Sequence, residues 1–372
     1  MPERLTTIAR EWGRIGCVGF GGPPAHIALL RELCVERRRW ITERDFEDAL
    51  AAVNLLPGPA STQLSVYCAY RVRGRVGALV GGLCFILPGL VLILALAAAF
   101  LADDPPAWLR GAGAGAGAAV AAVAVKAGLD LIRPTWTRSR SRIAYILLGA
   151  LAAATLGPWL VLVLLACGFA SLALGARAAG VFAPPVFLAA ATAGTGGIAA
   201  LCWTALKVGA LSYGGGFVII PLMQADAVGT HHWMTDTQFL NAVALGQVTP
   251  GPVTHTIAVV GYAVAGVGGG LLAALIAFSP SFLFVLGGAD RFHALLRNHR
   301  ARAFIDGAAP AALGAILGSA IPLAAALTEW WQAAVLAAAA VALLVLRAGV
   351  VPTLLAAGAA GALVGLGGGP LP

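Results

Sequence analysis

Two short stretches of the sequence combine a Pro-Gly-Pro break with hydroxyl and amide side chains. The first runs from Asn54 to Gln63 and the second from Gln247 to Thr256. Each interrupts an apolar run, and proline ends a helix because it lacks an amide proton and clashes with the preceding turn. We predict that the second proline of each break is the first residue of a new helix. The predicted hinge residues are the four prolines of the two breaks, Pro57, Pro59, Pro250 and Pro252.

The chemistry expected at such breaks is anion binding. The first amide protons of a helix have no partner within it, and the helix dipole adds about half a positive charge there. The free amides should be those of residues 60–62 in the first copy and 253–255 in the second. The predicted substrate-binding residues of the two breaks are Asn54, Gly58, Ala60, Ser61, Thr62 and Gln63, then Gln247, Gly251, Val253, Thr254, His255 and Thr256.

Two helix ends supply only about one positive charge, so a dianion needs further compensation. Lys207 lies inside an apolar run and aligns with Arg14, and a cation in such a run is a functional candidate, with snorkelling to the interface as the alternative. His26 and His255 are candidates for proton coupling because histidine titrates near neutral pH. For either histidine, the alternative is a packing role.

Glycine pairs form a second candidate wall of the site, since glycine allows close approach of the backbone. The glycines predicted to contribute to it are Gly21, Gly22, Gly214 and Gly215.

The composition is that of an integral membrane protein. Of the 372 residues, 60% are hydrophobic and 11% are charged, against about 25% charged in soluble domains. Several apolar runs reach the roughly 20 residues that a helical span needs, and no barrel-type alternation is present. We therefore expect an all-α, polytopic helical bundle in the lipid bilayer. The net charge of +8 comes mainly from loop arginines, so it indicates membrane topology rather than nucleic-acid binding.

The spacing of the cysteines predicts neither a metal site nor a disulfide framework. They are scattered without ligand spacing at Cys17, Cys34, Cys68, Cys84, Cys167 and Cys202. Buried cysteine commonly acts as a small apolar residue. We expect no cofactor and no metal site.

The chain contains an internal duplication. Adding 193 to the residue number aligns 16–77 with 209–270 without a gap. Phe20-Gly21-Gly22 then meets Tyr213-Gly214-Gly215, Trp40 meets Trp233, and the two Pro-Gly-Pro breaks coincide. We predict two membrane repeats, 1–178 and 179–372.

Loop charge predicts that the repeats have opposite orientations. The loops at 31–44, 71–75 and 126–142 are basic, whereas their equivalents near 224–237, 264–268 and 326–330 have no basic residue. The opposite holds for 102–106, which has none, and its basic equivalent at 290–302. Since basic loops stay cytoplasmic, we expect an inverted repeat, a feature of secondary transporters.

The same rule favours a re-entrant hairpin at the first break. The basic segments 31–44 and 71–75 both belong on the cytoplasmic side, with only about 25 residues between them. Arms of 11–12 residues rise about 17 Å each, roughly half of a 30 Å hydrocarbon core. The alternative is one kinked span whose arginines at 71–75 snorkel at the far interface.

These motifs resemble the chromate ion transporter family. The resemblance rests on Phe20-Gly21-Gly22-Pro23, 35–40 and 55–64 in the first half, and on Tyr213-Gly214-Gly215-Gly216, 244–247 and 249–252 in the second. It covers essentially the whole chain and implies a two-repeat carrier of the inner cell membrane that exports chromate, driven by protons. The sequence is also compatible with a homodimer.

Two alternatives to a chromate exporter remain at this stage. One is a carrier of sulfate or another small anion, since sulfate has the same tetrahedral shape. The other is a membrane-embedded chromate reductase, which the absence of a redox motif and of paired catalytic carboxylates in a span disfavours.

Overall fold

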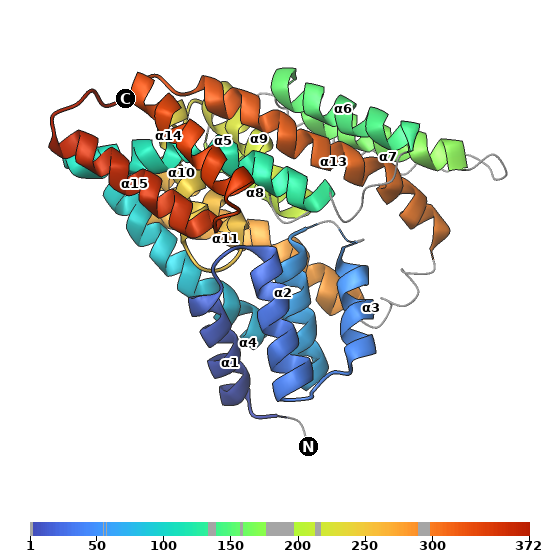
Figure 1. Cartoon of the computed structure of the whole chain (residues 1–372). Helices are drawn as coiled ribbons and strands as arrows, with labels where there is room; N and C mark the ends of the chain where they lie inside the picture. Colours follow the sequence, from blue (N-terminus) through green and yellow to red (C-terminus); the bar gives the residue numbers. More distant parts are fainter. Residues whose placement is uncertain are drawn as a thin grey trace.

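The structure is a computed structural model that describes residues 3–54, 56, 58–132, 139–156, 159–175, 197–212, 217–288 and 298–372 (Figure 1). Within these ranges the chain forms helices and turns and contains no strand. The described helices that are long and apolar enough to cross a membrane are Ala60–Phe100, Ala107–Ile132, Val253–Gly288 and Arg302–Ala325. The prediction of an all-α, multi-pass membrane protein is therefore confirmed.

The first half opens with paired helices separated by short breaks. In chain order these are α1 (Leu5–Val18), α2 (Pro23–Arg31), its π-helical continuation η1 (Glu32–Arg37), α3 (Glu43–Val53) and α4 (Ala60–Phe100). Thr42 caps α3 by accepting a hydrogen bond from the Asp45 amide, as expected for threonine at a helix start. The Phe20-Gly21-Gly22 motif lies between α1 and α2, and the first Pro-Gly-Pro motif lies between α3 and α4.

Helix α4 doubles back on itself. Its backbone leaves helical geometry at Arg73 and Gly74, where Gly74 has φ 59°. A Cβ placed on Gly77 would lie 2.5 Å from the carbonyl oxygen of Ala69, a residue two turns away in an unbroken helix. The arm before Arg73 therefore packs antiparallel to the arm after Gly74. An unbroken helix of 41 residues would measure about 61 Å, twice the hydrocarbon core.

The second half forms the same sequence of elements. They are α8 (Ile198–Leu211), α9 (Ile219–Gln224), the π-helix η4 (Ala225–Thr230), α10 (Asp236–Val248), the 3₁₀ turn η5 (Val253–His255) and α11 (Thr256–Gly288). The backbone of α11 breaks at Ala265 (φ −150°, ψ 36°) and Gly266 (φ 58°, ψ −150°), nearly the angles of Arg73 and Gly74. Both halves thus turn back in the same way.

The kinks correct the register of the predicted duplication. The breaks are 193 residues apart, but Gly74 and Gly266 are separated by 192. The second half is one residue shorter between its Pro-Gly-Pro break and its kink. A 3₁₀ turn rises about 2.0 Å per residue against 1.5 Å in an α-helix, so η5 covers its length with fewer residues. The ungapped alignment therefore holds through the breaks but not as far as the kinks.

The remaining helices interlock the two halves. They are α5 (Ala107–Ile132), α6 (Arg140–Thr155), α7 (Leu160–Gly175), α13 (His299–Ala325), α14 (Trp330–Ala340), η7 (Val341–Val345) and α15 (Val350–Leu366). Helices α6 and α7 pack along α13 (Figure 1), whereas α14 and α15 pack along α5. Each half therefore places its last helices on the long helix of the other half. Small residues such as Gly111 and Gly361 form these contacts, as is common between membrane helices.

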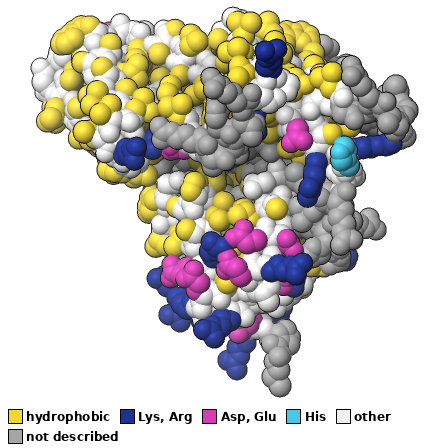
Figure 2. All heavy atoms as spheres, turned by 45° about the vertical axis from the view of Figure 1, so that its right-hand side comes forward, with side chains coloured by type: hydrophobic (Ala, Val, Ile, Leu, Met, Phe, Trp, Pro, Cys, Tyr) yellow, Lys and Arg dark blue, Asp and Glu magenta, His cyan; other side chains and the backbone are white. Residues whose placement is uncertain are grey.

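Ion pairs join the ends of the first-half helices. Arg31 pairs with Glu43 and Glu47, and Arg37 and Arg38 both pair with Glu11. The hydrogen bond from Arg38 to Glu11 raises the pKa of the Arg38 guanidinium. Figure 2 shows charged side chains gathered at the lower end of the molecule, below a largely hydrophobic upper part.

A further ion pair shows how the two helices that flank the first Pro-Gly-Pro break are arranged. Arg71, at the end of the first arm of α4, lies 3.4 Å from Asp45, at the start of α3. The outer ends of α3 and of this arm are therefore neighbours, and the segment is a helical hairpin with the Pro-Gly-Pro motif at its tip.

Candidate functional site

The tip of the first Pro-Gly-Pro hairpin lies against the second half of the chain. Gly58 has φ 120°, a conformation that favours glycine. A Cβ at Gly58 would lie 2.6 Å from Nε2 of Gln63, 3.3 Å from the carbonyl oxygen of Gly209 in α8, and 3.5 Å from the Ser281 hydroxyl in α11. The backbone at this tip therefore fits closely between its own Gln63 and two helices of the other half.

The second tip makes the reciprocal contacts with the first half. Gly251 has φ 95°, and its amide donates a 3.0 Å hydrogen bond to the carbonyl oxygen of Gly19, at the break after α1. A Cβ on Gly89 in α4 would lie only 2.1 Å from the carbonyl oxygen of Pro250. The two Pro-Gly-Pro tips are therefore each buried against the opposite half, and three of the four residues contacted there, Gly209, Gly19 and Gly89, are glycines.

The new helices begin one residue later than predicted. Pro59 and Pro252 are both caps with extended backbone (ψ 104° and 134°), so neither is the first helical residue. The helix after Pro59 begins at Ala60, which leaves the predicted amides of Ala60, Ser61 and Thr62 in its first turn.

In the second copy one predicted donor is already used. The His255 amide donates a 2.9 Å hydrogen bond to the carbonyl oxygen of Pro252. The tighter 3₁₀ turn causes this, since it closes bonds between residues three apart. Of the predicted amides, those of Val253 and Thr254 remain at the start of the turn.

Each of the two predicted histidines packs against the ring of a phenylalanine in a long helix. The His26 ring contacts the edge of Phe85 at 5.1 Å between centroids, and its Nε2 lies 2.9 Å from the carbonyl oxygen of Gly19. The His255 ring makes the equivalent contact with Phe278 at 5.2 Å. His255 also lies beside Gly89, where a Cβ would be 2.8 Å from its Cε1. Both imidazoles are fully buried.

Polar side chains around the tips are buried without hydrogen-bond partners. Among the described residues they include the hydroxyls of Thr62, Ser65 and Ser281, the amide nitrogen of Gln247 and Nδ1 of His26. Such groups cost free energy unless water, an ion or a ligand satisfies them. Buried unpartnered polar groups on and beside the helix breaks are what a polar ligand site requires.

The other predicted residues of the breaks occupy different environments. Gln63, Thr254 and Thr256 are buried at the tips. The Thr254 hydroxyl lies 3.4 Å from that of Ser212, while Thr256 donates to the carbonyl oxygen of Val253. Asn54 is exposed.

The predicted glycine wall is only partly described. Gly21 is exposed and Gly22 half-buried, and a Cβ at Gly22 would lie 3.9 Å from Val253. Pro57, Gly214 and Gly215 lie outside the described residues.

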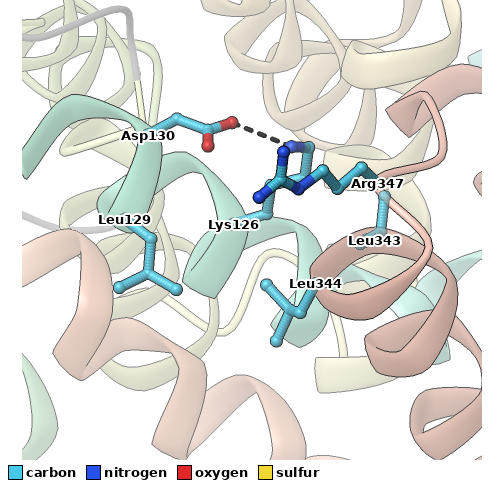
Figure 3. Close-up of a pocket in the computed structure, with 6 residues that line it drawn as sticks. All are labelled: Lys126, Leu129, Asp130, Leu343, Leu344 and Arg347. Atoms are coloured by element: carbon cyan, nitrogen blue, oxygen red, sulfur yellow. Dashed lines mark ion pairs between the residues drawn. The ribbon is translucent and has the colours of Figure 1, made fainter. Parts of the chain in front are cut away.

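The two predicted cations are not gathered at the tips. Arg14 is exposed on α1. Lys207 forms a 2.5 Å ion pair with Asp226 in η4, so its charge already has an anionic partner. A different group of charges lines a cavity of about 200 Å³ between α5 and η7 (Figure 3). There Lys126 pairs with Asp130 at 3.0 Å, beside Arg347.

Comparison with known proteins identifies the family. A family model described as chromate transporter matches residues 6–172 and again 199–366. The chain belongs to the chromate transporter family. This match runs through both sets of hairpins, and the family is one of membrane transport proteins rather than enzymes.

Curated relatives of this chromate transporter family member agree with the match. It is 34% identical to a chromate transport protein of Cupriavidus metallidurans over 99% of this chain and 94% of the relative. It is 33% identical to one of Pseudomonas aeruginosa over 88% of this chain and 83% of the relative. A probable chromate transport protein of Synechococcus elongatus is 29% identical over 86% of this chain and 84% of the relative. No solved structure matches the chain.

Several residues at the tips of this family member were missed by the sequence reasoning. Gly89 and Ser281 each follow a proline inside a long helix, Pro88 and Pro280, with a spacing of 192 between the copies. That repeated proline was a usable signal. Gly209, two residues from Lys207, had been aligned with Gly16 but was not assigned a contact. Asp226 lies in a segment with no distinctive motif.

Proposed function

We propose that this protein is a secondary transporter that exports chromate across the inner cell membrane. The observation that carries the proposal is the set of buried, unpartnered polar groups on the Pro-Gly-Pro segments and on the helices that contact them. Hydroxyls, amides and helix starts are donors that suit a tetrahedral oxyanion. The names of the relatives favour chromate among such anions.

In this proposal the hairpins are re-entrant and the halves are inverted repeats. The hairpin bases of the first half carry the basic residues, for example Arg37, Arg38 and Arg71, which belongs on the cytoplasmic side. The second half would then enter from the opposite side, and the tips would meet near the middle of the bilayer. Rocking of one half against the other would expose the bound anion alternately to each side.

The charge of chromate and the residues at the tips indicate where a coupling proton could bind. The contacts at the described tips come from uncharged groups and from two histidines, His26 and His255. A dianion there needs positive charge beyond that of the helix starts. His26 and His255 are the candidate proton carriers: a histidine that binds a proton after the anion has left on the outer side, and releases it on the cytoplasmic side, would couple inward proton flow to export.

The test is the flux of labelled chromate into everted membrane vesicles, with and without a pH gradient. We expect saturable uptake that the gradient stimulates, and loss of uptake when Pro250 is replaced by alanine. Absence of saturable chromate uptake would refute the proposed substrate, and uptake that ignored the gradient would refute proton coupling. Unlabelled sulfate is the competitor: at saturating chromate, half-inhibition by an equal concentration of sulfate would favour a general sulfate-type carrier.

A further inference from the structure

An ion pair with a buried carboxylate joins helix α8 to the π-helix η4 in the second half. Asp226, in the π-helix η4, is 4% exposed. Its Oδ2 lies 2.5 Å from the Lys207 Nζ and accepts a 2.9 Å hydrogen bond from the Thr204 hydroxyl. Lys207 and Thr204 both belong to α8, one of the shorter apolar helices. The pair therefore links α8 to η4 away from the Pro-Gly-Pro tips.

Packing alone does not explain this pair. Removing two charges from water is costly, and a buried ion pair is often no more stabilising than apolar residues of similar volume. Ionisable groups inside membrane segments are accordingly rare and mark ion or proton pathways. A π-helical turn, such as the one that carries Asp226, is also frequent at functional sites.

The first half has an ion pair at the corresponding place with the charges exchanged, because its carboxylate lies on the first helix, α1, and its cations lie in and just after the π-helix η1. By the 193-residue shift, Lys207 corresponds to Arg14, which is exposed, and Asp226 corresponds to Leu33. The carboxylate of the first half, Glu11, is instead bound by Arg37 and Arg38. The second half differs in the burial of its cation, since the Lys207 side chain is 17% exposed, against 41% and 42% for Arg37 and Arg38.

The pair is connected to the anion site through α8. Gly209 follows Lys207 by two residues, and its carbonyl oxygen forms part of the close contact with Gly58 at the first tip. On its other side Gly209 packs on the backbone of α11, where a Cβ would lie 2.0 Å from the carbonyl oxygen of Ala277. A movement of α8 relative to η4 would therefore move a wall of the anion site.

We propose that Asp226 binds the proton that drives transport, and that the Lys207–Asp226 ion pair opens when the proton is bound. This inference rests on the proposed function, and it places the coupling proton of that transporter on Asp226 instead of on His26 or His255. One proton forms an O–H bond with the Asp226 carboxylate, which neutralises it and leaves the Lys207 ammonium without its anionic partner. The same O–H bond breaks when the proton leaves on the other side, and the ion pair forms again.

Few other charged groups surround Asp226 among the described residues. On α8 the charged neighbour is Lys207. On α10, Asp236 accepts a hydrogen bond from the Gln224 amide at 3.2 Å, and at the end of η4 His231 stacks on Trp233. Neither α9 nor α11 contains an Asp, Glu, Lys, Arg or His. Among the described residues, Lys207 is therefore the charged group that a proton on Asp226 affects most directly.

The experiment compares gradient-driven accumulation with exchange in proteoliposomes that contain the full-length protein. One coupled proton converts a gradient of one pH unit into about a tenfold concentration ratio. We expect Asp226→Asn to lose this tenfold accumulation and the chromate-dependent proton uptake, while exchange of labelled for unlabelled chromate continues. The matched control is Asp130→Asn, which removes the carboxylate of an ion pair on α5 that is 48% exposed. It should behave as the wild type does.

The outcomes separate the inference from the proposed function. Wild-type protein that shows no saturable chromate flux would overturn the proposed function itself. Wild-type accumulation together with normal accumulation by Asp226→Asn would overturn only the inference. If Asp226→Asn does not fold, the doubly neutral variant Lys207→Gln, Asp226→Asn replaces it, because it leaves no unpaired buried charge. Coupled transport by that variant would also overturn the inference.

Discussion

Replacing Gly89 by alanine should force the second Pro-Gly-Pro tip away from α4. The new Cβ would lie 2.1 Å from the carbonyl oxygen of Pro250 and 2.8 Å from Cε1 of His255. A backbone oxygen cannot rotate aside as a flexible side chain does. The tip must therefore move by about 1 Å to reach an ordinary van der Waals distance.

The expected cost follows from two opposing effects. Overpacking a close-packed site costs about 1–3 kcal/mol, and a backbone clash belongs at the upper end of that range. Alanine in place of glycine in a helix returns about 1 kcal/mol. The net loss for Gly89→Ala is about 2 kcal/mol. If this loss falls on the conformation that binds the anion, the apparent affinity for chromate decreases about 30-fold.

The assay measures thermal unfolding of the purified protein together with chromate uptake into everted vesicles. Gly268→Ala is the matched control, because Gly268 lies in the corresponding long helix α11 and a Cβ there would meet nothing within 4 Å. We expect the control to transport normally and to be as stable as the wild type or more so. Our placement of the second tip against α4 is refuted if Gly89→Ala has the stability and uptake of Gly268→Ala.

Three further predictions use single contacts. Ser281→Ala removes a buried hydroxyl that has no partner, so it should weaken chromate binding about tenfold without lowering the melting temperature; a lower melting temperature with unchanged binding would contradict a ligand role. Arg39→Gly and Arg347→Gly should each stabilise the protein by about 1 kcal/mol in thermal unfolding, because these residues have φ 51° and 57° and glycine adopts that conformation without strain; no gain in either would contradict the assigned backbone geometry. Glu11→Gln removes the shared partner of Arg37 and Arg38 and should lower the free energy of unfolding by about 1 kcal/mol, since both arginines are partly exposed. The difference between the wild type and the variant should be smaller in 1 M salt. Equal stability of the two proteins would show that these ion pairs do not stabilise the fold.

The hairpin breaks could be predicted because they depend on local chemistry. Pro-Gly-Pro ends a helix whatever surrounds it, and loop arginines at both ends of the segment indicated a hairpin before the Arg71–Asp45 contact was known. The all-α membrane fold followed equally from composition. These features are properties of short segments and of the solvent around them.

The contacts between the halves could not be predicted in the same way. Nothing in the local sequence says that Gly58 meets Gly209, or that Pro250 meets Gly89, since such contacts depend on how distant helices pack. The partner of Lys207 was missed for the same reason: Asp226 is 19 residues further along, on another helix. The one-residue change of register arose from a 3₁₀ turn, which no residue type specifies by itself.

The packing partners of α6 and α7 also could not be predicted from the sequence. Helices α6 and α7 directly follow α5 in the chain, yet they lie along α13. Apolar helices rich in alanine and glycine offer several equivalent faces to their neighbours, so the pattern of residues does not select one partner. The exchange ties the two halves together.

The most direct test of an anion site between the Pro-Gly-Pro tips is equilibrium binding of labelled chromate to the purified protein. We predict saturable binding by the wild type, about tenfold weaker binding by Ser281→Ala and by Thr62→Ala, and wild-type binding by Asp130→Asn at the distant α5 cavity. Wild-type affinity in both tip variants, with their folding intact, would contradict the site.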